Sequence, residues 1–212
     1  MATRVVSVSL YDKVLGNPFV YNVLRPFVVG GIDMTAFFSR LEATSSDVVF
    51  DVGCGTGVAL DYLPPVGRYV GFDTDQRALD AARKRGSTRS EPIELHAREL
   101  QRADVESQQP HVVGLAGLLH HLDDDTCVHV LSMLRASQSL RRVVTWDITF
   151  LPGELINNLL SILDRGQYPR HPGGYNFLAE KAGYRVQDAQ AVSCKGNSGR
   201  AKYWLMTLTP NP

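Results

Sequence analysis

Residues 48–57 read VVFDVGCGTG and decide the fold. Three apolar residues lead into Asp51, and glycine then occupies every second position. The apolar run predicts a buried parallel strand, and the glycines predict a tight turn whose backbone can approach a ligand closely. Residues 58–63 predict a short helix that ends before Pro64. A strand, a glycine turn and a helix in this order form a nucleotide-type site, with N–H groups and the positive helix end facing the ligand.

The spacing of the glycines distinguishes between nucleotides. A dinucleotide fingerprint needs its third glycine three residues after the second, but that position is Val58, and Gly57 comes one residue early. Asp51 would also repel a pyrophosphate, whereas it suits a ligand with a positive end. S-adenosylmethionine is such a ligand, because it carries an ammonium and a sulfonium and has no phosphate.

A second strand is predicted at residues 68–73, and its last residue, Asp73, follows Gly53 by about 20 residues. That spacing places a carboxylate beside the glycine turn, where it can accept hydrogen bonds from both ribose hydroxyls. Thr74-Asp75 then predicts the N-cap of a helix over residues 76–85.

These motifs resemble those of class I S-adenosylmethionine-dependent methyltransferases, of the bacterial small-molecule type. DVGCGTG at residues 51–57 is similar to the first motif of that family, and GFDTD at residues 71–75 is similar to the second. The resemblance covers residues 48–208. It implies S-adenosyl-L-methionine as the methyl donor, S-adenosyl-L-homocysteine as the product, and a Rossmann-like α/β fold. That fold is a doubly wound, seven-stranded and mostly parallel sheet with an antiparallel C-terminal hairpin and an N-terminal helical cap.

At 212 residues the chain predicts a single domain with one core. We expect residues 1–45 to form the helical cap and residues 46–150 the donor-binding core. Residues 151–172 are an expected insertion on the acceptor side, and residues 173–212 hold the last helix and the terminal hairpin.

The resemblance places the donor against the ends of several strands. In the family, an acidic residue just after the third strand usually binds the adenine amino group. The third strand is predicted here at residues 93–96, and Glu99 is the nearest acidic residue after it. Arg98 could instead stack on the adenine, or the two could form a surface pair. The predicted donor-binding residues are Asp51, Gly53, Cys54, Gly55, Thr56, Gly57, Asp73, Thr74, Arg98, Glu99, Ala116 and Gly117.

Three residues near the ends of later strands are candidates for catalysis. His120 and His121 follow the fourth strand, and Asp147 lies near the end of the fifth. Either histidine could act as a base, but a similar histidine packs structurally in many members of the family. Asp147 could orient an acceptor or take its proton, or could equally bond a loop backbone.

Two segments are candidates for holding the acceptor. The aromatic-rich N-terminal segment would cap the donor site and line the acceptor pocket, or its aromatic residues could simply pack together. Residues 164–170, DRGQYPR, resemble an Asp-x-Gly-x-x-x-Arg pattern of some bacterial small-molecule methyltransferases, whose arginines could hold an acidic or phenolic acceptor or pin the loop. The predicted acceptor-binding residues are Tyr11, Tyr21, Arg25, Arg165, Tyr168 and Arg170.

Composition narrows the choice of partners. Lys plus Arg and Asp plus Glu balance at 22 each, so no global field favours nucleic acid or a membrane. The three cysteines show no metal spacing, and the acidic run at residues 123–125 predicts a helix cap, so we expect no metal site. We see no signal peptide and no membrane-spanning run, which predicts a cytoplasmic protein of unknown oligomeric state.

The sequence therefore favours methyl transfer to a small-molecule acceptor. An RNA methyltransferase stays open through the basic clusters at residues 83–85 and 141–142. A regulatory protein that binds the donor without turnover is a second alternative. Gly57 and Val58 argue against a nicotinamide oxidoreductase.

Overall fold

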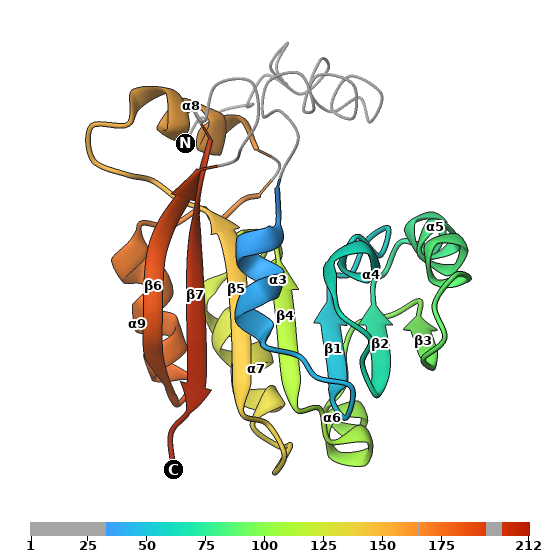
Figure 1. Cartoon of the computed structure of the whole chain (residues 1–212). Helices are drawn as coiled ribbons and strands as arrows, with labels where there is room; N and C mark the ends of the chain where they lie inside the picture. Colours follow the sequence, from blue (N-terminus) through green and yellow to red (C-terminus); the bar gives the residue numbers. More distant parts are fainter. Residues whose placement is uncertain (1–32, 165, 194–200) are drawn as a thin grey trace, which may run out of the picture.

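A computed structural model describes residues 33–164, 166–193 and 201–212 of the chain. They form a seven-stranded sheet with the order β3-β2-β1-β4-β5-β7-β6 (Figure 1). The strands are β1 (Val48–Val52), β2 (Arg68–Phe72), β3 (Ile93–His96), β4 (Val112–Ala116), β5 (Arg142–Ile148), β6 (Tyr184–Ser193) and β7 (Lys202–Pro210). The first five are parallel, and β7 pairs antiparallel with both β5 and β6. The predicted doubly wound sheet with its terminal hairpin is confirmed.

The helices fill the connections between the strands. They are α3 (Thr35–Leu41), α4 (Ala59–Tyr62), α5 (Gln76–Gly86), α6 (Arg102–Gln108), α7 (Asp124–Leu134), α8 (Leu155–Leu163) and α9 (Pro172–Lys181), with a 3₁₀ turn, η1 (Leu119–His121). The predicted caps of α5 and α7 are confirmed, since Asp75 accepts from Arg77 N and Asp123 accepts from Thr126 N. Residues 91–110 predict a strand and a turn, but α6 also forms there. Asp104 marks its start by accepting a hydrogen bond from Gln101 N, a weaker sequence signal than a Ser or Thr cap.

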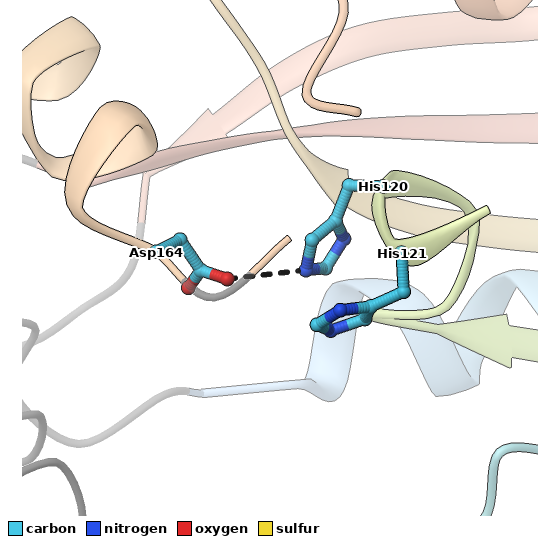
Figure 2. A group of neighbouring side chains, drawn as sticks. All are labelled: His120, His121 and Asp164. Carbon is cyan, nitrogen blue, oxygen red and sulfur yellow. Dashed lines mark ion pairs between the residues drawn. The ribbon is translucent and has the colours of Figure 1, made fainter. Parts of the chain in front are cut away.

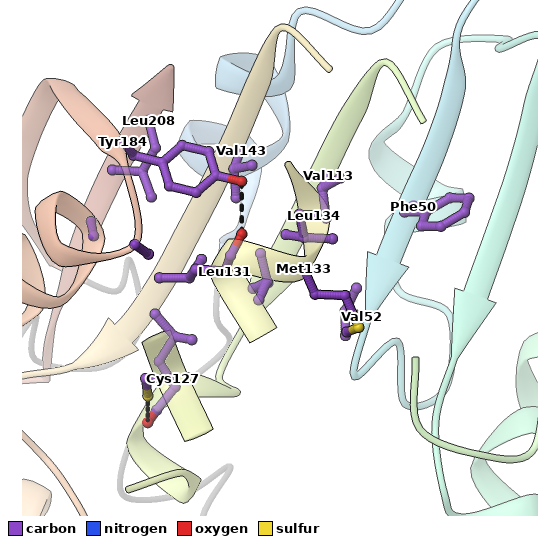
Figure 3. Packing of buried hydrophobic residues seen from close by; sticks show 14 of the residues in the cluster. Phe50, Val52, Val113, Cys127, Leu131, Met133, Leu134, Val143, Tyr184 and Leu208 are labelled. Atoms are coloured by element: carbon purple, nitrogen blue, oxygen red, sulfur yellow. Dashed lines mark hydrogen bonds between the residues drawn. The ribbon is translucent and has the colours of Figure 1, made fainter. Parts of the chain in front are cut away.

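The parallel strands bury both of their faces. Val49 packs with α3 and α4 on one face, whereas Phe50 and Val52 pack with α7 on the other. Figure 3 shows the second cluster, in which Tyr184 donates a hydrogen bond to the carbonyl of Leu131. This burial on both faces explains why the strands read as continuous apolar runs.

The C-terminal tail and the exposed face of α8 differ from what the sequence predicts. Residues 210–212 predict a frayed tail, but Pro210 still pairs with Tyr184, and Asn211 N donates to the carbonyl of Gly183. The helical spacing of the apolar residues in α8 predicts one buried face, but Leu155 is 82% exposed and Ile162 is 61% exposed. The side of α8 that is buried instead carries Asn157 and Ser161.

The α8 helix lies beyond the carboxyl ends of the parallel strands (Figure 1). Asn157 and Ser161 both donate to the carbonyl of Thr149, just after β5. The expected insertion therefore stands at the edge of the sheet where α/β folds bind ligands. None of the described helices is both long and apolar enough to cross a bilayer.

Gly57 offers a test of how the glycine turn packs. Its φ is +70°, and an added Cβ would lie 2.8 Å from the Cβ of Ala82 on α5. Gly57→Ala should lower the free energy of unfolding by roughly 2–4 kcal/mol, from left-handed strain and overpacking together. Urea denaturation measures the change.

Gly55→Ala is the matched control, because its φ of +50° carries the same kind of strain while nothing lies within 4 Å of the added Cβ. It should cost only about 1–2 kcal/mol. Equal losses in the two variants would contradict the packing described here.

Candidate functional site

The glycine turn leaves β1 and folds over the end of β2. Gly53, Gly55 and Gly57 all have positive φ, at 76°, 50° and 70°, so the turn uses conformations that residues with a Cβ avoid. The N–H groups of Gly53 and Cys54 both donate to the carbonyl of Phe72, at 2.8 and 3.0 Å. The turn is thus fixed to the neighbouring strand by its backbone.

Asp73 ties the same turn from its side chain. One carboxylate oxygen accepts from Gly55 N at 2.8 Å, and the other accepts from Asp75 N at 2.8 Å. Each carboxylate oxygen has two acceptor sites, so both retain capacity for a further donor. Asp73 therefore shapes the turn and still offers acceptors to a ligand.

A cavity of about 380 Å³ opens beside Asp73. Its polar side holds Gly53, Asp73, Thr74, Arg98 and Glu99. Its apolar side is formed by Leu100 after β3, by the residues on either side of η1, Leu118 and Leu122, and by Val130 and Met133 of α7. The sequence analysis missed this apolar wall, because leucine and methionine at helical spacing look like ordinary core.

A second cavity, of about 290 Å³, lies on the other side of Gly53. Gly53 lines both cavities. The second one takes in Asp51, Cys54, Gly55, Thr56, Ala116 and Gly117, all of which were predicted as donor-binding. Its remaining wall is apolar and aromatic, from Met34, Phe38, Val58, Ala59, Trp146 and Tyr203. Trp146 and Tyr203 were not predicted, because they come together only when β5 pairs with β7.

Asp51 is a buried carboxyl at the floor of this second cavity. It is 7% exposed and accepts a hydrogen bond from the Tyr69 hydroxyl at 2.6 Å. Burial and the nearby charge of Asp73 together raise the pKa of Asp51 to about 6, although the Tyr69 hydrogen bond lowers it. The same surroundings raise the pKa of the Cys54 thiol, so Cys54 is a neutral turn residue.

Arg98 departs from one predicted role. Its guanidinium binds both oxygens of Asp104 at 2.6 and 2.7 Å and lies over the Phe72 ring, with Cζ 5.6 Å from the centroid. The expected pairing of Arg98 with Glu99 is replaced by this pair with α6. Arg98 and Glu99 both line the first cavity, so contact with a bound base stays a prediction for each.

The three candidates for catalysis lie in one polar cluster with Asp164, in which His120 and Asp147 are buried. His120 Nδ1 lies 2.8 Å from Asp147 Oδ1, and its Nε2 lies 3.4 Å from Asp164 Oδ1. Figure 2 shows His121 beside His120 and Asp164. The ring centroids of His120 and His121 are 4.2 Å apart. His120 and Asp147 are 2% and 1% exposed, whereas His121 is exposed.

This geometry argues against His120 as a general base. Both ring nitrogens face a carboxylate, and the two carboxylates raise the pKa of His120 to about 9 despite its burial. Asp147 Oδ1 is likewise used, since it also accepts from His120 N at 3.1 Å, whereas the buried Oδ2 has no hydrogen-bond partner among the described residues. The structural alternative left open by the sequence is thus favoured for both residues: they position the chain after β4.

Arg170 pins a loop and does not face an acceptor. Its five N–H groups are all used: by the Asp124 carboxylate and by the carbonyls of Leu119, Leu122 and Tyr168. Because its donors are all used within the fold, the loop-pinning alternative that the sequence left open is favoured for Arg170. Tyr168 is 41% exposed, and its backbone N–H donates to the carbonyl of His120.

Four of the predicted acceptor-binding residues, Tyr11, Tyr21, Arg25 and Arg165, lie outside the described residues. The sequence also predicts short helical pieces at residues 11–15 and 18–25, which lie outside the described residues as well. It predicts a helix over residues 32–41 with Phe37, Phe38 and Leu41 as the apolar stripe. These three residues are buried in α3, the described part of the cap.

Comparison with known proteins identifies the type of domain. Residues 49–139 match a family model described as a methyltransferase domain. A search of curated proteins finds no significant match.

Solved structures with the same fold include three methyltransferases. One is the mitomycin 7-O-methyltransferase MmcR (TM-score 0.62, 17% identity, 96% of this chain and 61% of that chain). Another is a Streptococcus pneumoniae protein described as a putative tRNA (m1A22) methyltransferase (TM-score 0.57, 10% identity, 85% of this chain and 71% of that chain). The third is from a complex of the Haloferax volcanii Trm112 activator with a putative methyltransferase (TM-score 0.67, 13% identity, 98% of this chain and 100% of that chain). This chain thus spans less than two thirds of MmcR.

Replacing Arg170 tests whether it pins the loop. Arg170→Met should lower the free energy of unfolding by roughly 2–4 kcal/mol, because three carbonyls and a carboxylate lose charged donors. Chemical denaturation measures this loss. Arg102→Met is the control, since the exposed pair of Arg102 with Glu106 on α6 is worth only about 0.3–0.5 kcal/mol. An Arg170→Met variant as stable as the control would contradict the pinning role.

Proposed function

We propose that this class I methyltransferase transfers a methyl group from S-adenosylmethionine to a small molecule. One observation carries the proposal: two cavities meet at Gly53, and each contains a carboxylate suited to one end of this donor. Asp73 offers acceptors to ribose hydroxyls, and Asp51 offers negative charge to the ammonium. The match of residues 49–139 to a methyltransferase domain supports the same function.

The adenosine half suits the first cavity. The ribose would hydrogen-bond to Asp73, and the adenine would lie between the Phe72–Arg98 side and the apolar side chains of Leu100 and Met133. The predicted contact of Glu99 with the adenine amino group belongs to this arrangement. The methionine half would then pass Gly53 into the second cavity, toward Asp51 and Gly117.

The acceptor would approach from the aromatic side of the second cavity. Phe38 and Trp146 line it together with Tyr203, and all three are at most 6% exposed. A wall of buried aromatic side chains favours a small, partly apolar acceptor. MmcR, which shares the fold, is described as a mitomycin 7-O-methyltransferase.

Methyl transfer from this donor needs little general acid–base catalysis. The acceptor's lone pair attacks the methyl carbon in line with the carbon–sulfur bond, that bond's electrons go to sulfur, and the acceptor proton leaves to solvent. Aligning the partners can be worth about 7–11 kcal/mol, whereas a general base contributes about 10²–10⁴-fold. A site whose histidine is held between carboxylates can therefore still catalyse methyl transfer.

The basic clusters give little support to an RNA substrate. Arg83 pairs with Asp80 and Arg85 with Asp61. In the second cluster Arg141 binds Asp47 through two hydrogen bonds. Arginines used in this way are less available to phosphates.

The donor assignment is tested by replacing Asp73. Calorimetry should show the wild type binding both S-adenosylmethionine and S-adenosylhomocysteine, and Asp73→Ala should weaken both by roughly 1–3 kcal/mol through lost ribose hydrogen bonds. Asp80→Ala, on the exposed face of α5, is the control and should leave both affinities unchanged. An unaltered affinity in Asp73→Ala would contradict the placement of the ribose. Binding without product formation across a set of phenolic and carboxylic acceptors would favour the regulatory alternative.

The Asp51 carboxyl makes donor binding depend on pH. Its pKa of about 6 means that its charge forms between pH 5 and 7, where an α-ammonium remains protonated. The affinity for S-adenosylmethionine should therefore rise about tenfold over this range. In the Asp51→Asn variant, the affinity for S-adenosylmethionine should not change with pH over this range. The same slope in wild type and variant would show that another group is responsible.

A further inference from the structure

We propose that His120, His121 and Asp164 form a binding site for a divalent transition-metal ion of the Zn²⁺ class. The two histidines come from η1 and the carboxylate from the end of α8, so the cluster joins segments far apart in the sequence (Figure 2). One ligand atom from each residue lies within 4.8 Å of the other two. The proposal does not depend on the proposed methyl acceptor.

The orientation of His120 is already that of a metal ligand. Its Nδ1 faces Asp147 Oδ1 at 2.8 Å, and the same oxygen accepts from its backbone N–H. Histidines that bind metals commonly donate their other ring N–H to a carboxylate, which fixes the tautomer and the ring. With Nδ1 held in this way, Nε2 is the ligand atom, and it points toward Asp164.

The distances suit a small ion. Two ligands at about 2.1 Å from a tetrahedral ion lie about 3.4 Å apart, and His120 Nε2 lies 3.4 Å from Asp164 Oδ1. Asp164 Oδ1 also accepts a hydrogen bond from Gly166 N at 3.0 Å, which orients the carboxylate. A ring nitrogen of the exposed His121 lies within 4.8 Å of both atoms, so His121 supplies the third ligand.

The ligand set indicates the class of metal. Two imidazoles and one carboxylate suit Zn²⁺ and other divalent first-row ions, and three protein ligands leave a coordination position open. With His120 neutral, the two positive charges of the ion would offset the charges of Asp147 and Asp164. The site borders the second cavity, because an added Cβ on Gly117 would lie 3.7 Å from His120 Cε1.

The sequence analysis predicted no metal site because it considered only patterns of residues close together in the chain. Cysteine spacing and the acidic run at residues 123–125 were the patterns considered. The ligands proposed here are two adjacent histidines and an aspartate from the end of α8, and only the fold brings them together.

Metal titration of the chelator-treated protein tests the proposal. Calorimetry with Zn²⁺ should show one ion per chain, and Co²⁺ should give visible absorption bands of nitrogen and oxygen coordination. His121→Ala and Asp164→Asn should each weaken Zn²⁺ by at least about 100-fold. Asp147→Asn should keep the stoichiometry and weaken binding by about 10–100-fold.

His129→Ala is the matched control, because His129 is an exposed histidine on α7 away from the cluster. It should keep the wild-type affinity, and circular dichroism checks that each variant is folded. Absence of stoichiometric Zn²⁺ or Co²⁺ binding in the wild type would overturn the proposal. So would equal binding by wild type, His121→Ala and Asp164→Asn, since the ion would then be adventitious.

Discussion

The site depends on the attachment of one turn to the neighbouring strand. Gly53 N and Cys54 N bind the carbonyl of Phe72, and Gly55 N binds the carboxylate of Asp73. These three bonds hold the exit of β1 over the exit of β2, and the positive φ values of the glycines make the path possible. Without this attachment, the two cavities on either side of Gly53 would have no common wall.

Polar groups at this edge of the sheet fall into two kinds. Asp51 and Asp73 line cavities and retain acceptors for a ligand. All five N–H groups of Arg170 are instead used within the fold, and Asp147 uses its Oδ1 to hold His120. The distinction matters for function, because a charged residue whose hydrogen bonds are already made holds the site's shape and adds little direct affinity.

The sequence predicted those features that are local or periodic. The strand and glycine turn of residues 48–57, the spacing to Asp73 and the caps at Asp75 and Asp123 each follow from a few adjacent residues, and all are found in the structure. What it could not give were contacts made by distant segments. Trp146 meets Tyr203 only through the pairing of β5 with β7, and His120 meets Asp164 only through the placement of α8.

A crystal structure with S-adenosylhomocysteine tests the central claim most directly. The account predicts the ribose hydroxyls on the Asp73 carboxylate, the adenine against Leu100 and Met133, and the amino group directed to Asp51. The vacant methyl position would then face Phe38 and Trp146. A nucleoside bound elsewhere, or a glycine turn that stays closed to it at saturating concentration, would contradict the account.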